Sequence, residues 1–333
     1  MSNKCYINAA EQVSCQLPLS EEWMQAPIIS EEEYLRCIEP SVKEMISPGE
    51  ARRMSAILKR AIVTSFTALK KSDIEVPEAI ITGTGMGCME NSEKFLIDLA
   101  NYGENCLKPS LFMQSTHNTI SSLVAILLKC HGYNNTFSHK GISFDSALLD
   151  AWIQIKAGVI TNALVGAHDE TTPFMAKVLR KTHPEYGMIT EASMSTLLTS
   201  ERSDKNICEL SGVEISHNSS IEDIALKLNA QDDKVLLLGV NGVEENDTPY
   251  RDLISRLEYN PLLLQYKNIF GNNFSISALG FYVAVKLIEM QKVPSFMYYG
   301  ENERSENRLE GITLINHSEN NNWSIIRLKL CGS

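Results

Sequence analysis

The chain has 333 residues, of which 44% are hydrophobic and 21% are charged, and a chain of this length and composition can bury its own core without disulfides or metals. Its 30 lysines and arginines against 41 aspartates and glutamates give a net charge of −11, which excludes nucleic acids and anionic membrane surfaces as main partners. No basic segment followed by an apolar stretch opens the chain, and no run approaches about 18 uninterrupted apolar residues. We therefore expect a cytoplasmic protein.

The 8 cysteines are scattered, without a C-x-x-C pair or a cluster with histidine. This spacing predicts buried free thiols and suggests neither a disulfide framework nor a zinc site. We expect no metal and no cofactor.

Apolar runs of strand length recur along the chain and are separated by turn signals. CYINAAEQVS has the alternation of an opening strand, whereas NALVGAHDE and SMSTLLTSE are typical of strands buried on both faces. In chain order the expected strands lie at 5–14, 77–87, 162–170, 193–201, 207–216, 234–243, 311–318 and 323–330.

Helical spacing of apolar residues occupies segments between these strands. Residues 49–71 are predicted to form one amphipathic helix, and 119–132 an almost wholly apolar helix that we expect to be buried on most sides. Further helices are expected at 89–103, from about Asp145 and at 277–294.

A polar interruption at 200–206 separates two halves that both alternate strands with helices. This alternation predicts an α/β protein with layered sheets. We place the boundary near residue 205, which gives an N-terminal half of 1–205 and a C-terminal half of 206–333.

Two features invite a functional interpretation on their own. GTGMG at 83–87 could bring backbone amides to a phosphate, but it lacks the third glycine of GxGxxG in its place, which favours a tight strand-to-helix turn. His117 and His168 could be general bases, but neither has a serine or cysteine partner evident from the sequence, which favours structural roles.

Five stretches, in the same order and register, resemble the β-ketoacyl synthases of the thiolase superfamily. GTGMGCMENSEKF is similar to the family's GTG-x-G-x-x-E turn, PSLFMQSTHNTISSLVAILLKCHG to its asparagine and buried-helix segment, and DAWIQIKAGVITNALVGAHDE to the helix and strand that follow its nucleophile. LLLGVNGVEENDTPYRDL and YKNIFGNNFSISALGFYVAVKLIEM are similar to the segments that carry its two catalytic histidines. The resemblance extends from about 77 to 290 and implies a thiolase-like five-layer α-β-α-β-α sandwich of two related halves, with the second half trimmed.

In that family a cysteine holds the acyl chain as a thioester, while two histidines and an oxyanion hole stabilise the intermediates. By resemblance the cysteine position falls on Gly141 and the first histidine on Asn241. The second histidine falls on Asn272, or on Phe274 if the helix at Gly280 sets the register. Glycine has no nucleophile and asparagine cannot exchange a proton near neutral pH, so the resemblance implies a chain without catalytic residues.

Of two further features of the family pattern, a glycine-rich loop is absent and a lysine is present. The family's Gly-Phe-Gly-Gly loop, which supplies an oxyanion-hole amide, is replaced by NHSENNNWS. Lys267 falls on the family's lysine, and without a catalytic histidine to support we expect it to make a structural hydrogen bond or ion pair.

The family also contains degenerate members, the chain-length factors, which pair with an active ketosynthase and help to set product length. The resemblance is greatest to the short subunits of this kind in aryl polyene, flexirubin and dialkylresorcinol pathways. It implies a heterodimer with an active β-ketoacyl synthase, and only indirect contact with an acyl carrier protein. The tunnel gate and its neighbours fall on Thr116, His117 and Ile120, and the interface strand falls on 134–140 with Asn134, Phe137 and His139.

Two alternatives remain open. One is an enzyme of the same superfamily that uses His139 or His168 with Asp145 and Asp169 for malonyl decarboxylation or hydrolysis. The other is a homodimeric acyl-binding scaffold. Because acyl carrier proteins are acidic, an acidic chain is not expected to offer their main docking surface, although the basic segment 52–60 could contribute.

Overall fold

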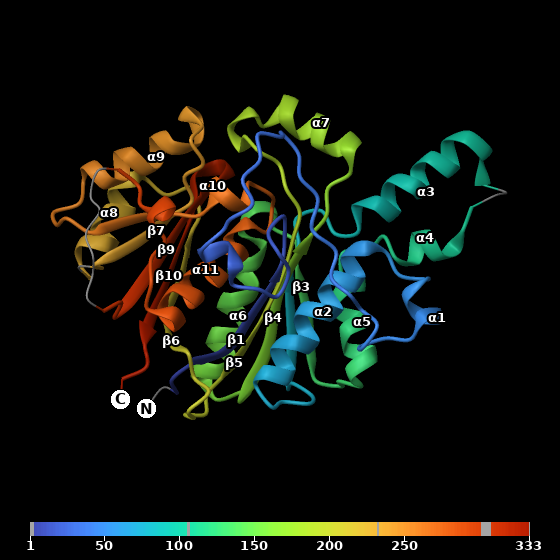
Figure 1. Ribbon diagram of the computed structural model, residues 1–333, viewed down its shortest axis with the longest axis horizontal. Coiled ribbons are helices and arrows are strands. Elements are labelled where there is room, and N and C mark those ends of the chain that lie inside the picture. The colour runs from blue at the N-terminus through green and yellow to red at the C-terminus, as the bar shows by residue number, and fades with distance from the viewer. Residues whose placement is uncertain (1–2, 105–106, 232, 301–307, 333) are drawn as a thin grey trace.

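The computed structural model describes residues 3–104, 107–231, 233–300 and 308–332, and its strands fall into two groups of related topology (Figure 1). The strands of the first half are β1 (Tyr6–Val13), β2 (Ala79–Gly83), β3 (Tyr133–Phe137), β4 (Asn162–Asp169) and β5 (Ala192–Thr199). Those of the second half are β6 (Cys208–Ser216), β7 (Val235–Leu238), β8 (Leu262–Gln265), β9 (Gly311–Ser318) and β10 (Asn322–Leu330).

The two halves repeat one strand order. The first half runs β3-β2-β4-β5-β1 and the second half runs β8-β7-β9-β10-β6, so that corresponding strands occupy corresponding places. In the first half β2 is parallel to its neighbours β3 and β4, and β5 is antiparallel to its neighbours β4 and β1. In the second half β7 is parallel to β8 and β9, and β10 is antiparallel to β9 and β6. A short antiparallel pairing of β1 with β6, at Tyr6 and Ile7, joins the groups into ten strands in one order.

Helices lie between the two groups of strands and outside them. The α-helices of the first half are α1 (Pro48–Ala51), α2 (Ala56–Lys71), α3 (Met89–Tyr102), α4 (Pro109–Met113), α5 (Thr119–Leu128), α6 (Ser143–Ala157) and α7 (Pro173–Thr182). Those of the second half are α8 (Ile221–Asn229), α9 (Glu244–Ser255), α10 (Lys267–Phe270) and α11 (Ile276–Met290). Short 3-10 turns lie at Glu22–Met24, Lys140–Ile142, Pro184–Tyr186, Ser295–Met297 and Glu319–Asn321.

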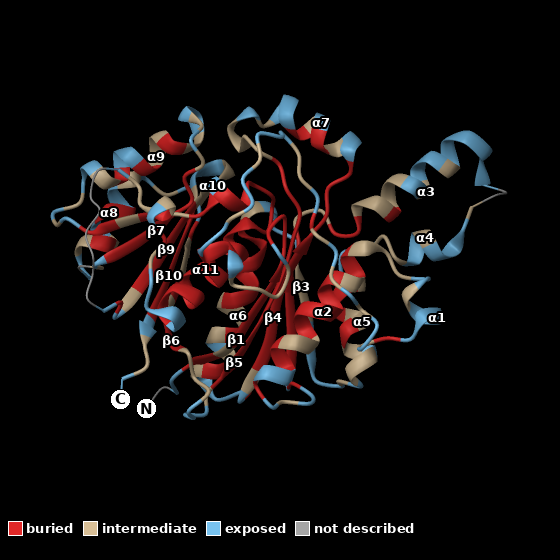
Figure 2. Cartoon of the chain, viewed as in Figure 1, coloured by how far each residue is buried: buried red, intermediate tan, exposed pale blue. Residues whose placement is uncertain are grey.

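The alternation of side chains along the strands separates the helical layers. Ile81 of β2 and Leu237 of β7 point into one central cluster with α6 and α11, whereas their neighbours point outward. Ile80 packs against α2 and α5 on one side, and Leu236 packs against α8 and α9 on the other. The layer order is therefore α-β-α-β-α, which confirms the predicted architecture. Figure 2 shows the central α11 buried on all sides.

Two predicted helices differ from the structure. The single helix expected at 49–71 is divided, because Ser47 caps the short α1 and Ser55 has an extended conformation (ψ 168°) that starts α2 anew. The apolar helix expected at 119–132 ends at Leu128 and is not buried on most sides, because the side chain of Ile126 is 71% exposed. Its apolar sequence does not reflect burial within this chain.

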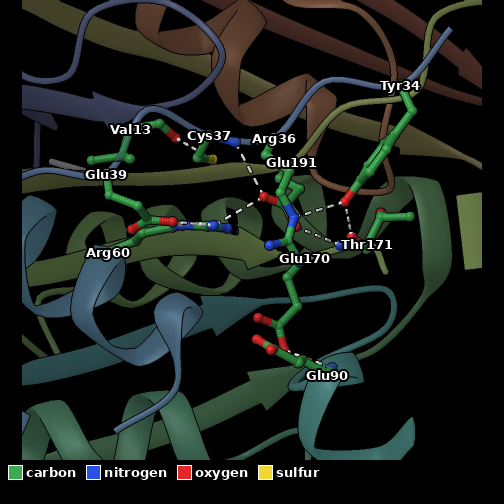
Figure 3. Close-up of polar contacts among 10 residues, drawn as sticks. All are labelled: Val13, Tyr34, Arg36, Cys37, Glu39, Arg60, Glu90, Glu170, Thr171 and Glu191. Carbon is green, nitrogen blue, oxygen red and sulfur yellow. Dashed lines mark hydrogen bonds and ion pairs between the residues drawn. The ribbon is translucent and has the colours of Figure 1, made fainter. Parts of the chain in front are cut away.

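The long connection between β1 and α1 is anchored by buried charge (Figure 3). The guanidinium of Arg60, on α2, lies between the carboxylates of Glu39 and Glu191 and is paired with both. Glu191 also accepts a hydrogen bond of 3.1 Å from the backbone N–H of Cys37. Since unpairing a buried charge is costly, these contacts hold the connection across the ends of the strands.

The remaining expectations concern cysteines, the boundary and membranes. Cys106 lies outside the described residues, and the described cysteines are all free thiols, most of them buried. The boundary expected near residue 205 lies in the segment between β5 and β6, and it stays a prediction, as does the trimming of the second half. None of the helices among the described residues has the length and apolar character that crossing a membrane requires.

Candidate functional site

A pocket of about 160 Å³ opens where the two halves meet. It lies beside the start of α6 from the first half and the starts of α10 and α11 from the second, with the β9–β10 turn on its wall. Its lining residues are Gly141, Glu185, Tyr186, Glu245, Asn246, Lys267, Asn272, Asn273, Ile276, Ser277 and Asn316 to Asn321. The structure thus brings Gly141, Asn272 and Lys267 together, although they are up to 131 residues apart, whereas Asn241 lies behind the lining.

Gly141 lies in the 3-10 turn directly before α6, and a neighbouring side chain occupies the space next to it. A Cβ atom added to Gly141 would lie 2.8 Å from Cβ of Ser318 and 3.4 Å from its hydroxyl oxygen. Side-chain carbons do not approach so closely, so any residue other than glycine here requires the β9–β10 turn to move. At the position that the resemblance assigns to the nucleophile, a side chain is thus crowded by Ser318.

The two asparagines at the predicted histidine positions have structural contacts. The side-chain amide of Asn241 donates to the carbonyls of Glu185 (2.8 Å) and Tyr186 (3.1 Å), and its oxygen accepts from the N–H of Val243 (2.9 Å). Asn272 is buried; its backbone N–H donates a hydrogen bond to the carbonyl of Met188, and its carbonyl accepts one from the N–H of Thr190. Asn241 thus fastens the 3-10 turn Pro184–Tyr186 to the segment before α9.

Lys267 is buried in the pocket wall without a counter-ion in contact. Only 5% of the residue is exposed, and within the described residues its ammonium group makes no hydrogen bond and no ion pair. Burial lowers the pKa of Lys267 from 10.5 to about 8, and the more distant charge of Asp247 opposes part of that shift. The hydrogen bond or ion pair expected for this lysine is therefore not found.

Asn316 and His317, at the end of β9, are pocket residues that sequence reasoning missed. The side-chain oxygen of Asn316 accepts a hydrogen bond of 2.6 Å from the Tyr266 hydroxyl, but its buried Nδ2 has no acceptor in the described structure. The His317 ring lies 4.5 Å from the Trp323 ring, and its Nε2 likewise has no partner there. Burial lowers the pKa of His317, while Asn321 partly opposes the shift. An Asn-His pair at a strand end, next to a turn, was the available signal.

The GTGMG segment is a turn whose donors are already used. Asp169 accepts hydrogen bonds from the N–H groups of Gly85 (3.0 Å) and Met86 (2.8 Å) and from the Thr84 hydroxyl (2.9 Å). It also accepts from the hydroxyl of Ser275, just before α11. A phosphate would have to displace this buried carboxylate. These contacts agree with a tight structural turn and not with a nucleotide-binding loop.

The residues of the alternative catalytic mechanism do not form a working pair. His168 is enclosed in β4, and burial lowers its pKa to about 3, so it stays uncharged. Asp145 accepts a hydrogen bond of 2.8 Å from the Ser277 hydroxyl, and His139 contacts the Ser146 hydroxyl at 3.1 Å. Among these described residues no hydrogen bond joins either histidine to Asp145 or to Asp169.

Of the three predicted gate residues, two are accessible. Thr116 and His117 are exposed ahead of α5, and the Thr116 hydroxyl contacts that of Thr119 at 2.9 Å. Ile120 is 1% exposed, because it packs into this chain's own core against α2. Ile120 therefore cannot extend into a partner.

The predicted interface strand is β3, and it is an edge strand. It pairs with β2 on one side only, and its other side carries no strand of the described chain. Asn134 and His139 are exposed, and Phe137 is half-buried. A groove between β3 and α5 is lined by Asn134 and Ile126. We call the β3 strand with Ile126 of α5 and Met113 of α4 the edge surface.

Comparisons with known proteins agree with this geometry. A family model described as the β-ketoacyl synthase N-terminal domain matches residues 21–232. A type II polyketide synthase ketosynthase, solved with its acyl-carrier protein and bound to a hexaketide, superposes with a TM-score of 0.80 at 16% identity over 99% of this chain and 100% of its own.

Two other solved structures superpose over the whole of both chains. The ishigamide ketosynthase/chain length factor gives a TM-score of 0.80 at 15% identity. A β-ketoacyl synthase from Burkholderia phymatum STM815 gives 0.76 at 14% identity. At such identities the likeness establishes the fold alone. No curated protein matches the sequence.

Proposed function

The chain belongs to the β-ketoacyl synthase family, and from this premise we propose that it is a noncatalytic, chain-length-factor-like subunit of a heterodimeric ketosynthase. It pairs with an active β-ketoacyl-carrier-protein synthase and shapes the acyl tunnel of that partner. The pathway is polyketide synthesis of the aryl polyene kind or a fatty-acid-type synthesis. The acyl carrier protein docks mainly on the partner.

The observation that carries this proposal is the packing around Gly141. Condensation needs a thiol that can form a thioester, and Cβ of Ser318 lies only 2.8 Å from the place where the side chain of residue 141 would begin. The described lining of the pocket contains no cysteine. Asn241 and Asn272, at the positions of the family's two histidines, cannot take up or release protons near neutral pH, which also supports a noncatalytic role.

The edge surface supports pairing with a second protein. A free strand edge next to exposed apolar side chains favours association, because backbone groups and apolar area are both left without partners. Ile126 and Met113 are each 71% exposed, and Tyr133 on β3 is also exposed. The apolar sequence of α5 is explained if a partner covers the side that this chain leaves open.

Copurification tests the pairing. The chain is coexpressed with an affinity-tagged intact ketosynthase from the same gene neighbourhood, and we expect a one-to-one complex. Ile126→Asp places a charge in the edge surface and should abolish copurification. Leu226→Asp is the matched control, because Leu226 of α8 is 67% exposed but lies on the second half, and it should leave the complex intact.

Two results would count against the proposal. If Ile126→Asp and Leu226→Asp copurify equally well, the edge surface is not the interface. If the purified chain alone condenses or decarboxylates malonyl carrier protein, it is an enzyme and not a shaping subunit.

Product length tests the gate within the complex. Replacing Thr116 by Trp should shorten the products, and replacing it by Ala should lengthen them, since each buried methylene is worth about 0.8 kcal/mol in an apolar tunnel. Ile120→Val serves as the control, because Ile120 faces the core of this chain. Unchanged product length in both Thr116 variants would refute the gating role.

A further inference from the structure

The pocket contains hydrogen-bond donors that have no acceptor. Lys267 Nζ makes no hydrogen bond within the described residues, and the buried Nδ2 of Asn316 has no partner there. Lys267 and Asn316 are only 5% and 7% exposed. Buried polar groups in folded proteins are nearly always paired, so two unpaired donors on one wall require an explanation.

The side chains that carry these donors flank Gly239, which places no side chain between them. A Cβ atom added to Gly239 would lie 3.3 Å from Cε of Lys267 and 3.1 Å from Oδ1 of Asn316. Asn316 is held by the hydrogen bond that its oxygen accepts from Tyr266, which leaves its NH₂ group as the free end. The Lys267 and Asn316 side chains are therefore neighbours.

Among the described residues no carboxylate contacts the Lys267 ammonium group, although Glu185, Glu245 and Glu319 also line the pocket. Asp247 acts on Lys267 only at a distance, since its carboxylate accepts hydrogen bonds from the N–H groups of Asn241 (2.9 Å) and Gly242 (3.0 Å). An ammonium group and an amide that both donate are complementary to the two oxygens of a carboxylate.

We propose that this pocket binds a short monocarboxylate, with its carboxylate held by Lys267 and Asn316. The volume of about 160 Å³ corresponds to about five water molecules at about 30 Å³ each, which suits an acid of about four carbons. Glu185, Glu245 and Glu319 in the lining disfavour dianions such as phosphate. The inference concerns ligand binding and does not depend on pairing with a ketosynthase.

Calorimetric titration of the full-length chain with butanoate tests the site, with butanamide as the uncharged analogue of the same size. We expect saturable butanoate binding and binding of butanamide that is at least about tenfold weaker, since charge-assisted hydrogen bonds contribute more than neutral ones. Lys267→Met should reduce the affinity for butanoate by about tenfold or more. Lys292→Met, at an exposed lysine beyond α11, is the control and should bind as the unmodified chain does.

A second variant keeps the test decisive if Lys267→Met is poorly folded. Asn316→Asp has the same shape and can still accept from Tyr266, but its carboxylate repels the ligand, so butanoate affinity should fall while butanamide binding changes little. Absence of butanoate binding by the unmodified chain would overturn the proposal. Equal butanoate binding by the unmodified chain and both variants would also overturn it. Neither result would bear on copurification with the ketosynthase.

Discussion

Replacing Lys267 with methionine should stabilise the protein at neutral pH. Lowering the pKa of this lysine from 10.5 to about 8 means that the fold disfavours its charged form. At about 1.36 kcal/mol for each pH unit, the penalty amounts to about 3 kcal/mol. Methionine fills a similar volume without a charge, so Lys267→Met should raise the free energy of unfolding at pH 7 by up to about that amount.

The sign of the pH dependence follows from the same values. Between pH 8 and 10.5 the unfolded chain binds a proton on Lys267 that the folded chain has released, so the unfolding free energy of the unmodified chain rises with pH in this window. The advantage of Lys267→Met should therefore be greatest below pH 8 and shrink toward pH 10.5.

Urea denaturation from pH 6.5 to 10.5, without carboxylates in the buffer, measures this difference. Lys292→Met, which changes an exposed lysine, should follow the unmodified chain at every pH. A difference between Lys267→Met and the unmodified chain that stays constant with pH would refute the reasoning. So would a variant that is less stable at pH 7.

Three more predictions follow from contacts in the same region. Gly141→Cys should lower the unfolding free energy by about 1–3 kcal/mol through crowding against Ser318, and adding Ser318→Gly should recover most of that loss, as a double-mutant cycle in urea would measure. Neither variant should condense malonyl units, because the asparagines at 241 and 272 remain, and measurable condensation activity would contradict this. Asp169→Asn should lower the unfolding free energy by about 1–3 kcal/mol, since the N–H groups of Gly85 and Met86 lose a charged acceptor. Hydrogen exchange at these two amides should become faster, and unchanged protection of both would contradict this prediction. Butanoate affinity should weaken as pH rises above about 8, because the free Lys267 loses its proton. The other titratable groups of the lining are Glu185, Tyr186, Glu245, His317 and Glu319, and Asp247 acts on Lys267 from a distance. The loss should therefore vanish in Lys267→Met, and a loss that persists there would assign it to another group.

The layered fold could be predicted because its signals are local. Apolar runs of strand length and helical periodicity depend on residues near one another in sequence, and each strand expected from them is present. The helix at 49–71 was the main local error, since the sequence does not tell that Ser47 caps a separate short helix or that Ser55 has an extended conformation. α5 was misjudged for another reason, because an apolar sequence does not tell whether the same chain or another covers it.

The site could be predicted only in part. The motif register brought Gly141 and Asn272 to one pocket, since matching turns and helices preserve their relative positions. Two features of the site involve residues that are distant in sequence, so no local pattern predicts them. These are the contact of Gly141 with Ser318 and the proximity of Lys267 and Asn316 to Gly239. The role of Asp169 at the GTGMG turn was missed for the same reason.

The close approach of the β9–β10 turn to Gly141 also bears on how such a chain can evolve. A single substitution that placed a thiol at position 141 would meet the Ser318 side chain at 2.8 Å and would lower the stability of the fold. The turn would have to withdraw first, which brings no catalytic benefit by itself. Steric crowding thus makes a cysteine at position 141 hard to gain in a single step.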